Sequence, residues 1–494
     1  MSALGKALPS HRSRPRVAGR WAAQAPVLGA GLVVLGVEAL LAAAIVMPRL
    51  QLLLLAAVGV GALALVFRFP LASTAGLVVL TASVFHEQFF GAGFGPGGLR
   101  PYELLLGALL FVALVRPRRQ TWGGIAGMGL TLFLVLAAVS TVIAVSTGQI
   151  DLNKAYQWFR PLFLLAIFFV VVRLTEDATG ARRLLAAAAG AAALSAVIAV
   201  LLAYADTLDD IFKDPGSQYV SQEEGIKGFD RVRLPAVALA YALFFYAIAA
   251  LMRARGAARV AWSLTVLALT VHLGLSLNRN MWVGLVAGTV LLLMLWDPRA
   301  RARLGVGLAV TAVAFTTVLS VGPVGGLGSV LEPLAKRGLS VVSGLDENGS
   351  LRDRQRETRK AWATLGENPL IGIGAGTSYG SFTSSPALDG SFVRVPRRFL
   401  HNQYLYLALI AGIPALLGFL LFLGSVLRQA FARSHRGPEL ITCGVGVTML
   451  ALSAVVMLSF SSYNMITALA LLSGCTVVMA AEPAASAPHR AHAR

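Results

Sequence analysis

The chain alternates long apolar runs with short polar connections. Runs such as "LQLLLLAAVGVGALALVF" and "AVALAYALFFYAIAALM" contain no charged residue. A helix needs about 20 apolar residues to cross roughly 30 Å of hydrocarbon, which is longer than most strands and core helices. The pattern therefore predicts an all-α, polytopic membrane protein with about 12 to 14 transmembrane helices. The apolar segments lie at residues 26–47, 50–67, 70–86, 101–115, 122–147, 159–174, 184–204, 234–252, 258–277, 281–296, 303–321, 402–426, 438–458 and 463–481.

Basic residues gather at one end of these predicted helices. The connections "RPRRQ", "RARGAAR", "DPRARAR" and "RQAFARSHRG" all fall on the same side as the basic N-terminal tail. Lysine and arginine accumulate in short cytoplasmic loops. The sequence therefore predicts a multi-pass protein of the cell membrane with cytoplasmic N- and C-termini. The net charge of +19 is explained by these loops rather than by a nucleic-acid partner.

Two long loops fall on the outer side of this topology. Their arginines are not needed for orientation, because long loops are translocated whatever their charge. The second loop contains "GSLRDRQRETRKAW", the most basic stretch of that loop. The predicted parts are a cytoplasmic tail (1–25), N-terminal transmembrane helices (26–205), a first extracytoplasmic loop (206–233), transmembrane helices (234–321), a large extracytoplasmic loop with short helices (322–400), C-terminal transmembrane helices (401–481) and a cytoplasmic tail (482–494).

The outer arginines are candidates for binding a phosphate or pyrophosphate. A guanidinium group is always charged and presents paired donors that match phosphate oxygens. The alternative is contact with anionic lipid headgroups, or ion pairs with the nearby Asp346, Glu347, Asp353 and Glu357. The candidates are Arg231 and Arg233 in the first loop, Arg279 in the turn "SLNRNMW", and Arg352, Arg354, Arg356 and Arg359 in the second loop.

His401 opens the apolar run that follows the long loop, in "HNQYLYLALIAGIP". A histidine at a helix start can act as a base near neutral pH, or it can serve as a hydrogen-bonded anchor. The preceding "GENPLIGIGAGTSYG" lacks the strand context and spacing of nucleotide loops and predicts a rigid turn. No spacing typical of metal ligands occurs, so we expect no metal and no cofactor. His272 and Glu38, inside apolar runs, are expected to be structural.

Three motifs, in order, resemble the O-antigen ligase and polymerase family, which are integral membrane glycosyltransferases of the GT-C type. They are "LSLNRNMWVGLVAG", "RQRETRKAWATLGENPLIGIGAG" and "HNQYLYLALIAGIPALLGFLLF", and together they cover roughly residues 258–424. A site outside the cytoplasm has no ready ATP, so a donor activated as a lipid-linked pyrophosphate suits the same location.

The resemblance implies an undecaprenyl-pyrophosphate-linked glycan donor, a glycan or lipid-glycan acceptor, a bilayer setting and inversion at the anomeric carbon, without metal or cofactor. His401, Arg354 and Arg231 take the catalytic positions of the family pattern. Arg354 lies one helical turn before Thr358, where the family often has a tryptophan, and the tryptophan here is displaced to Trp362. The resemblance further implies substrate-binding roles for Arg233, Arg279, Arg352 and Arg359. It leaves open whether Arg231 or Arg233 contacts the donor, and it leaves Arg352, Arg356 and Arg359 as alternatives to Arg354.

The sequence leaves the acceptor open, and with it the choice between polymerase and ligase. We favour a polymerase or a general surface-glycan ligase, because no feature marks a lipid A-core acceptor. A secondary transporter or flippase of a lipid-linked glycan is the alternative class, and it predicts charged groups at mid-membrane depth and related halves. A non-catalytic scaffold would tolerate the loss of His401.

Overall fold

The computed structural model describes most of the apolar helices and half of the long loop. The chain forms two compact units, Met1–Ser73 and Thr74–Arg494, and the features discussed below lie within the second. The described residues are 60–61, 63–82, 100–116, 122–204, 220–222, 230–232, 236–276, 278–296, 298–299, 301–302, 304–309, 349–386, 392–434, 437–456 and 462–481.

The described part is predominantly helical, which confirms a polytopic helical membrane protein. Six of its helices are long and apolar enough to cross a membrane, and five shorter apolar helices accompany them. These helices are α3 (Pro70–Ala82), α4 (Pro101–Val115), α5 (Gly124–Ser146), α6 (Leu152–Phe163), which continues through η1 (Leu164–Ala166) into α7 (Ile167–Leu174), α8 (Ala178–Tyr204), α10 (Val237–Arg253), α11 (Ala257–Leu275), α12 (Arg279–Leu295), α17 (Ile413–Ala432), α18 (Pro438–Ser453) and α19 (Tyr463–Ala481). The nine-residue helix α16 (Gln403–Ala411) precedes α17.

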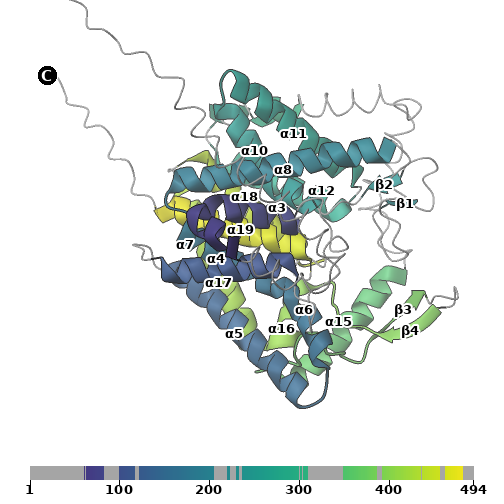
Figure 1. The fold of residues 1–494 in the computed structure, drawn as a ribbon. Coiled ribbons are helices and arrows are strands. Elements are labelled where there is room, and N and C mark those ends of the chain that lie inside the picture. The colour runs from purple at the N-terminus through teal and green to yellow at the C-terminus, as the bar shows by residue number, and fades with distance from the viewer. Residues whose placement is uncertain are drawn as a thin grey trace, which may run out of the picture. The chain divides into compact units, whose positions relative to one another are not determined.

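Helix α19 forms the centre of the second unit, with α7, α8, α10, α17 and α18 packed around it (Figure 1). Of its most apolar 18-residue window, 89% is buried, as expected for a helix that is apolar on every side. On one flank, α5 runs along α17, and a Cβ atom at Gly129 would lie 2.6 Å from the carbonyl oxygen of Gly418. Small residues thus let these two backbones approach closely, as they do between membrane helices.

The helix that starts at Leu152 is longer than the apolar run at 159–174 predicted. It begins earlier because the Asp151 side chain caps it, accepting the backbone N–H of Lys154 at 2.8 Å. Near its middle, Arg160 Nε lies 2.7 Å from Glu103 Oε1 of α4, and both side chains are buried. A buried charge is tolerated when it is paired in this way.

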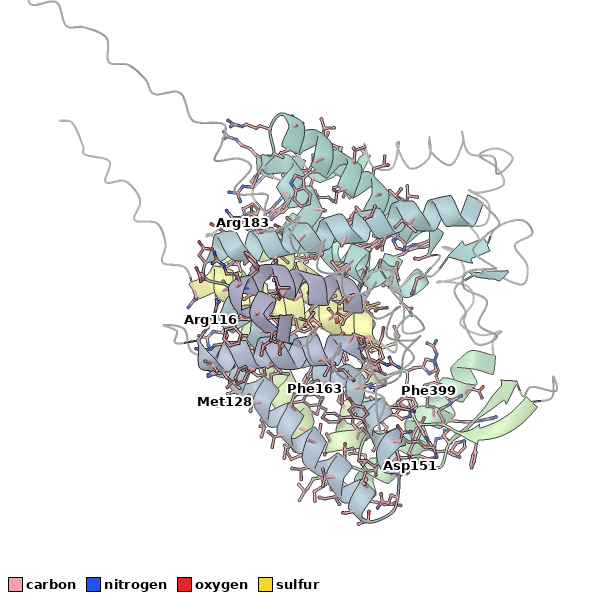
Figure 2. The ribbon with its side chains drawn as sticks, viewed as in Figure 1. Arg116, Met128, Asp151, Phe163, Arg183 and Phe399 are labelled. Carbon is pink, nitrogen blue, oxygen red and sulfur yellow. The ribbon has the colours of Figure 1, made fainter. Side chains whose placement is uncertain are left out.

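Two ends of the second unit differ in the residues that they carry. Figure 2 shows the labelled Arg116 and Arg183 at one end of the helices, and Asp151 and Phe399 at the other. Arg116, at the start of the connection "RPRRQ", and Arg183 therefore lie at the opposite end of the unit from the segment that ends the long loop. This separation agrees with the predicted alternation of cytoplasmic and outer loops.

The described part of the long loop contains a long helix, a turn and a β-hairpin, whereas the sequence pattern predicted short helices. Helix α15 (Gly349–Glu367) leads into the turn at 368–381, and strands β3 (Phe382–Pro386) and β4 (Phe392–Pro396) pair antiparallel. In the first loop, β1 (Val220–Gln222) pairs with β2 (Asp230–Val232). These short segments satisfy their backbone groups by pairing with each other, which an apolar-run search does not detect.

The predicted helix at 402–426 is interrupted at Gly412. Helix α16 ends at Ala411 and α17 starts at Ile413, with Gly412 at φ 85° and ψ 165°. The glycine-rich turn covers this break: the N–H groups of Ile373 and Gly374 donate to the last carbonyls of α16, at 2.9 and 3.0 Å. The break thus docks the end of the long loop onto the membrane helices.

Substituting Gly412 with alanine is expected to destabilise the protein. Its backbone conformation is almost restricted to glycine, which costs roughly 1–3 kcal/mol for another residue, and the added Cβ would lie 2.1 Å from the carbonyl oxygen of Leu370. Unfolding in detergent micelles measures the loss. Gly424→Ala in α17, which has open space around it, is the control and should be neutral or slightly stabilising. Equal stability of Gly412→Ala and the wild type would contradict this account of the break.

Candidate functional site

A buried carboxylate on α15 joins the long loop to the start of α16. Glu357 is 1% exposed and lies on the same helix face as the buried Ala361 and Leu365. Its Oε1 accepts the backbone N–H of His401 at 2.8 Å, and its Oε2 lies 2.9 Å from His401 Nδ1. Arg397 Nη1 donates to the same Oε2 at 3.1 Å. One acidic group thus contacts both a candidate base and an arginine.

Local structure on both sides fixes the backbone at His401. Before it, the N–H of Arg397 donates to the carbonyl of Ser381 at 2.7 Å, and Leu400 is fully buried. After it, Asn402 caps α16 by accepting the N–H of Leu405 at 3.1 Å. His401 therefore lies just before the N-terminus of α16, where hydrogen bonds fix the backbone on both sides of it. Its side chain remains 31% exposed.

Aromatic groups form one wall of this site. Arg397 Cζ lies 5.4 Å from the centroid of the Phe399 ring, and the Phe399 and His401 rings meet edge to face at 5.8 Å. Phe399 is labelled in Figure 2 on the segment between β4 and α16. The Tyr379 hydroxyl donates to the Phe399 carbonyl at 2.9 Å, and burial raises the pKa of Tyr379, so this tyrosine acts as a neutral donor.

Arg354 lies one turn before Glu357 on α15, and residues three apart share a helix face. Its side chain is half-buried, and its Nε is buried with no hydrogen-bond partner among the residues that the structure describes. A buried donor without a partner is costly, and an anion at this position would satisfy it. Arg354 is thus a suitable anion-binding group on the helix that carries Glu357.

The neighbouring arginines differ from Arg354. Arg356 is exposed, and its Nη1 lies 3.8 Å from Asp353 Oδ1, which is a weak surface contact. Arg359 is also exposed. The backbone of Arg352 lies in α15, but its side chain is outside the described part. Ion pairing with Asp353 therefore accounts for one arginine of this stretch. Glu357 instead contacts Arg397 and His401, at the end of the long loop.

The remaining candidates are placed only in part. Arg231 lies in β2, opposite Ser221, and Arg279 is the first residue of α12, but neither side chain is among those described. His272 is buried in α11, consistent with the expected structural role. The structure thus brings His401 together with the helix of Arg354. The structure does not describe four other residues considered from the sequence, which are Arg233, Asp346, Glu347 and Glu38.

The sequence interpretation missed the contacts that Glu357, Arg397 and Tyr379 make around His401 and Phe399. Glu357 was considered only as an ion-pair partner of basic residues in the loop, and 44 positions separate it from His401. One available signal was the four-residue spacing of Glu357, Ala361 and Leu365, which places a carboxylate on the buried face of an otherwise polar helix. Within the described part of the chain, no cluster of three His, Cys, Asp or Glu side chains could hold a metal ion.

The apolar helices define a multi-pass membrane protein, and the site lies where its long loop meets them. Residues 264–420 match the family model of the O-antigen ligases. The matched region runs from α11 into α17, so it contains both α15 and His401. This match supports assignment to the O-antigen ligase and polymerase family, as the sequence motifs predicted, and thereby a membrane glycan ligase or polymerase. No curated protein matches the chain.

Proposed function

We propose that the protein transfers glycan from an undecaprenyl-pyrophosphate-linked donor to a hydroxyl of a glycan acceptor. The reaction takes place at the outer face of the cytoplasmic membrane, without a metal ion. The observation that carries this proposal is His401, held at the start of α16 with Nδ1 engaged by Glu357 and its ring partly exposed. The family match over residues 264–420 supports the same chemistry.

In this reaction, His401 acts as the general base and Arg354 holds the leaving group. The acceptor hydroxyl gives its proton to the imidazole while its oxygen attacks the anomeric carbon. The bond between that carbon and the pyrophosphate oxygen breaks, and the oxygen takes the electron pair. A guanidinium group stabilises the negative charge that develops there. A single displacement of this kind inverts the anomeric configuration.

Further arginines complete the proposed binding of the donor. Arg231 acts with His401 and Arg354 from the first loop, and Arg233, Arg279, Arg352 and Arg359 supply additional positive charge to the pyrophosphate and glycan. The proposed orientation places both chain termini in the cytoplasm. It is supported by Arg116 and Arg183, which lie at the end of the unit opposite Phe399 (Figure 2). We favour polymerisation or general surface-glycan ligation over transfer to a lipid A core.

Reconstitution with a lipid-linked oligosaccharide tests this function. Proteoliposomes that contain the purified chain, the donor and a hydroxyl acceptor should form a new glycosidic bond. The rate should be unchanged in excess EDTA, because the proposed base and leaving-group contacts come from side chains. Movement of intact donor between leaflets without bond formation would instead support the flippase alternative, and loss of transfer in EDTA would contradict a metal-independent mechanism.

A further inference from the structure

The Glu357 carboxylate is buried and accepts hydrogen bonds from three donors. Oε1 accepts the His401 backbone N–H, and Oε2 lies against both His401 Nδ1 and Arg397 Nη1. With 1% of its side chain exposed, the carboxylate has no face left for a substrate. Glu357 is therefore excluded as the base or as a substrate ligand, and its effect on a reaction must pass through the residues it holds.

The contact between Glu357 and the His401 ring determines which ring nitrogen can accept a proton. A carboxylate oxygen accepts a hydrogen bond, so the imidazole nitrogen beside it carries the proton, and the other nitrogen keeps its lone pair. Since Glu357 meets Nδ1, the lone pair lies on Nε2. The backbone N–H of the same histidine binds the second oxygen at 2.8 Å, so the ring is held by two contacts rather than one.

Arg397 supplies a positive charge beside the Glu357 carboxylate. Its side chain is 12% exposed, and its guanidinium donates to Glu357 while it lies over the Phe399 ring at 5.4 Å. Breaking a buried ion pair is costly because it leaves one charge uncompensated, so Arg397 keeps the carboxylate in place. The arrangement of Arg397, Glu357 and His401 is thus a chain of hydrogen bonds that ends at a partly exposed imidazole.

We propose that Glu357 is the positioning residue of His401: it fixes the tautomer with Nε2 as the proton acceptor and stabilises the imidazolium formed in glycan transfer. This inference rests on the proposed function. As the acceptor oxygen bonds to the anomeric carbon, its proton moves to Nε2 and the pyrophosphate leaves with the electron pair of the broken bond. The resulting positive ring then lies 2.9 Å from a carboxylate oxygen.

Glu357→Gln tests this role with little change in shape. The amide has a single acceptor oxygen and no charge, so at least one of the three donors loses its partner. We expect kcat for transfer to fall by about a hundredfold or more, with the donor KM changed by less than about twofold. Asp353→Asn is the matched control, because it removes an exposed carboxylate from the same helix, and it should keep kcat within about twofold of the wild type.

The tautomer itself gives a second readout, which is measured on the wild-type protein and does not depend on folding of Glu357→Gln. In wild-type protein with isotope-labelled histidine, the His401 signal, identified by its absence in His401→Ala, should show protonated Nδ1 and bare Nε2 above neutral pH. A proton on Nε2 instead, or a kcat for Glu357→Gln within twofold of wild type, would overturn the inference. If the wild type transfers no glycan, or His401→Ala transfers normally, the proposed function fails first, and the two failures are distinguishable.

Discussion

His401→Ala should lower the rate of glycan transfer by about a thousandfold or more. The variant removes the only group that our proposal assigns to the acceptor proton, and general-base catalysis contributes about 10²–10⁴-fold. The Glu357 carboxylate and Arg397 guanidinium stay paired in this variant, so the fold around the site is retained. The measurement is the single-turnover transfer rate in proteoliposomes with saturating donor and acceptor.

Two controls show whether the lower rate of His401→Ala comes from the loss of the base. Donor binding should stay within about twofold of the wild type, because His401 acts on the acceptor rather than on the pyrophosphate. Added imidazole should restore part of the rate by entering the space that the side chain leaves. A transfer rate equal to that of the wild type would remove His401 from the mechanism and would instead fit the non-catalytic scaffold.

Arg354→Lys is expected to lower the transfer rate by about 10²–10³-fold. A lysine keeps the charge but loses the planar pair of donors that binds a pyrophosphate oxygen pair, and removing one donor to a developing oxyanion costs this much in other enzymes. Both kcat and donor affinity should fall, since the contact begins in the ground state. The rate is measured in the same proteoliposomes, across a range of donor concentrations.

Arg356→Lys is the matched control for this substitution. Arg356 lies on the same helix, but it is exposed and contacts only Asp353 among the partners described for it. Its variant should transfer glycan at the wild-type rate within about twofold. If Arg356→Lys loses activity while Arg354→Lys keeps it, the assignment of the donor contact along this stretch is wrong.

Much of the candidate site could be predicted from single residues, because their types carry the chemistry. His401 at a helix start was identified in this way, whereas Arg354 was selected among the arginines of its stretch by the resemblance to the family pattern. Their connection could not be predicted, since it depends on Glu357 and Arg397 meeting across the turn at 368–381 and the β3–β4 hairpin. Long-range contacts of this kind leave no local pattern in one sequence.

The fold shows the same division between local and long-range information. Within the described residues, apolar runs predicted the membrane helices well, because span length follows from the thickness of the bilayer. They failed at Gly412, where the run 402–426 stays apolar through the break between α16 and α17. The local signal was "AGIP", since glycine often ends a helix and proline is favoured in the first turn of the next. The docked turn at 368–381 explains why a break occurs there.

The central claim is that this chain breaks the bond between glycan and lipid pyrophosphate, with His401 as the base. The most direct measurement is the amount of free undecaprenyl pyrophosphate formed per glycan transferred, in proteoliposomes that contain only the purified protein, donor and acceptor. We predict that one undecaprenyl pyrophosphate is released for each glycosidic bond formed, and that His401→Ala releases almost none. Intact donor after prolonged incubation with the wild type, or equal release by His401→Ala, would contradict the account.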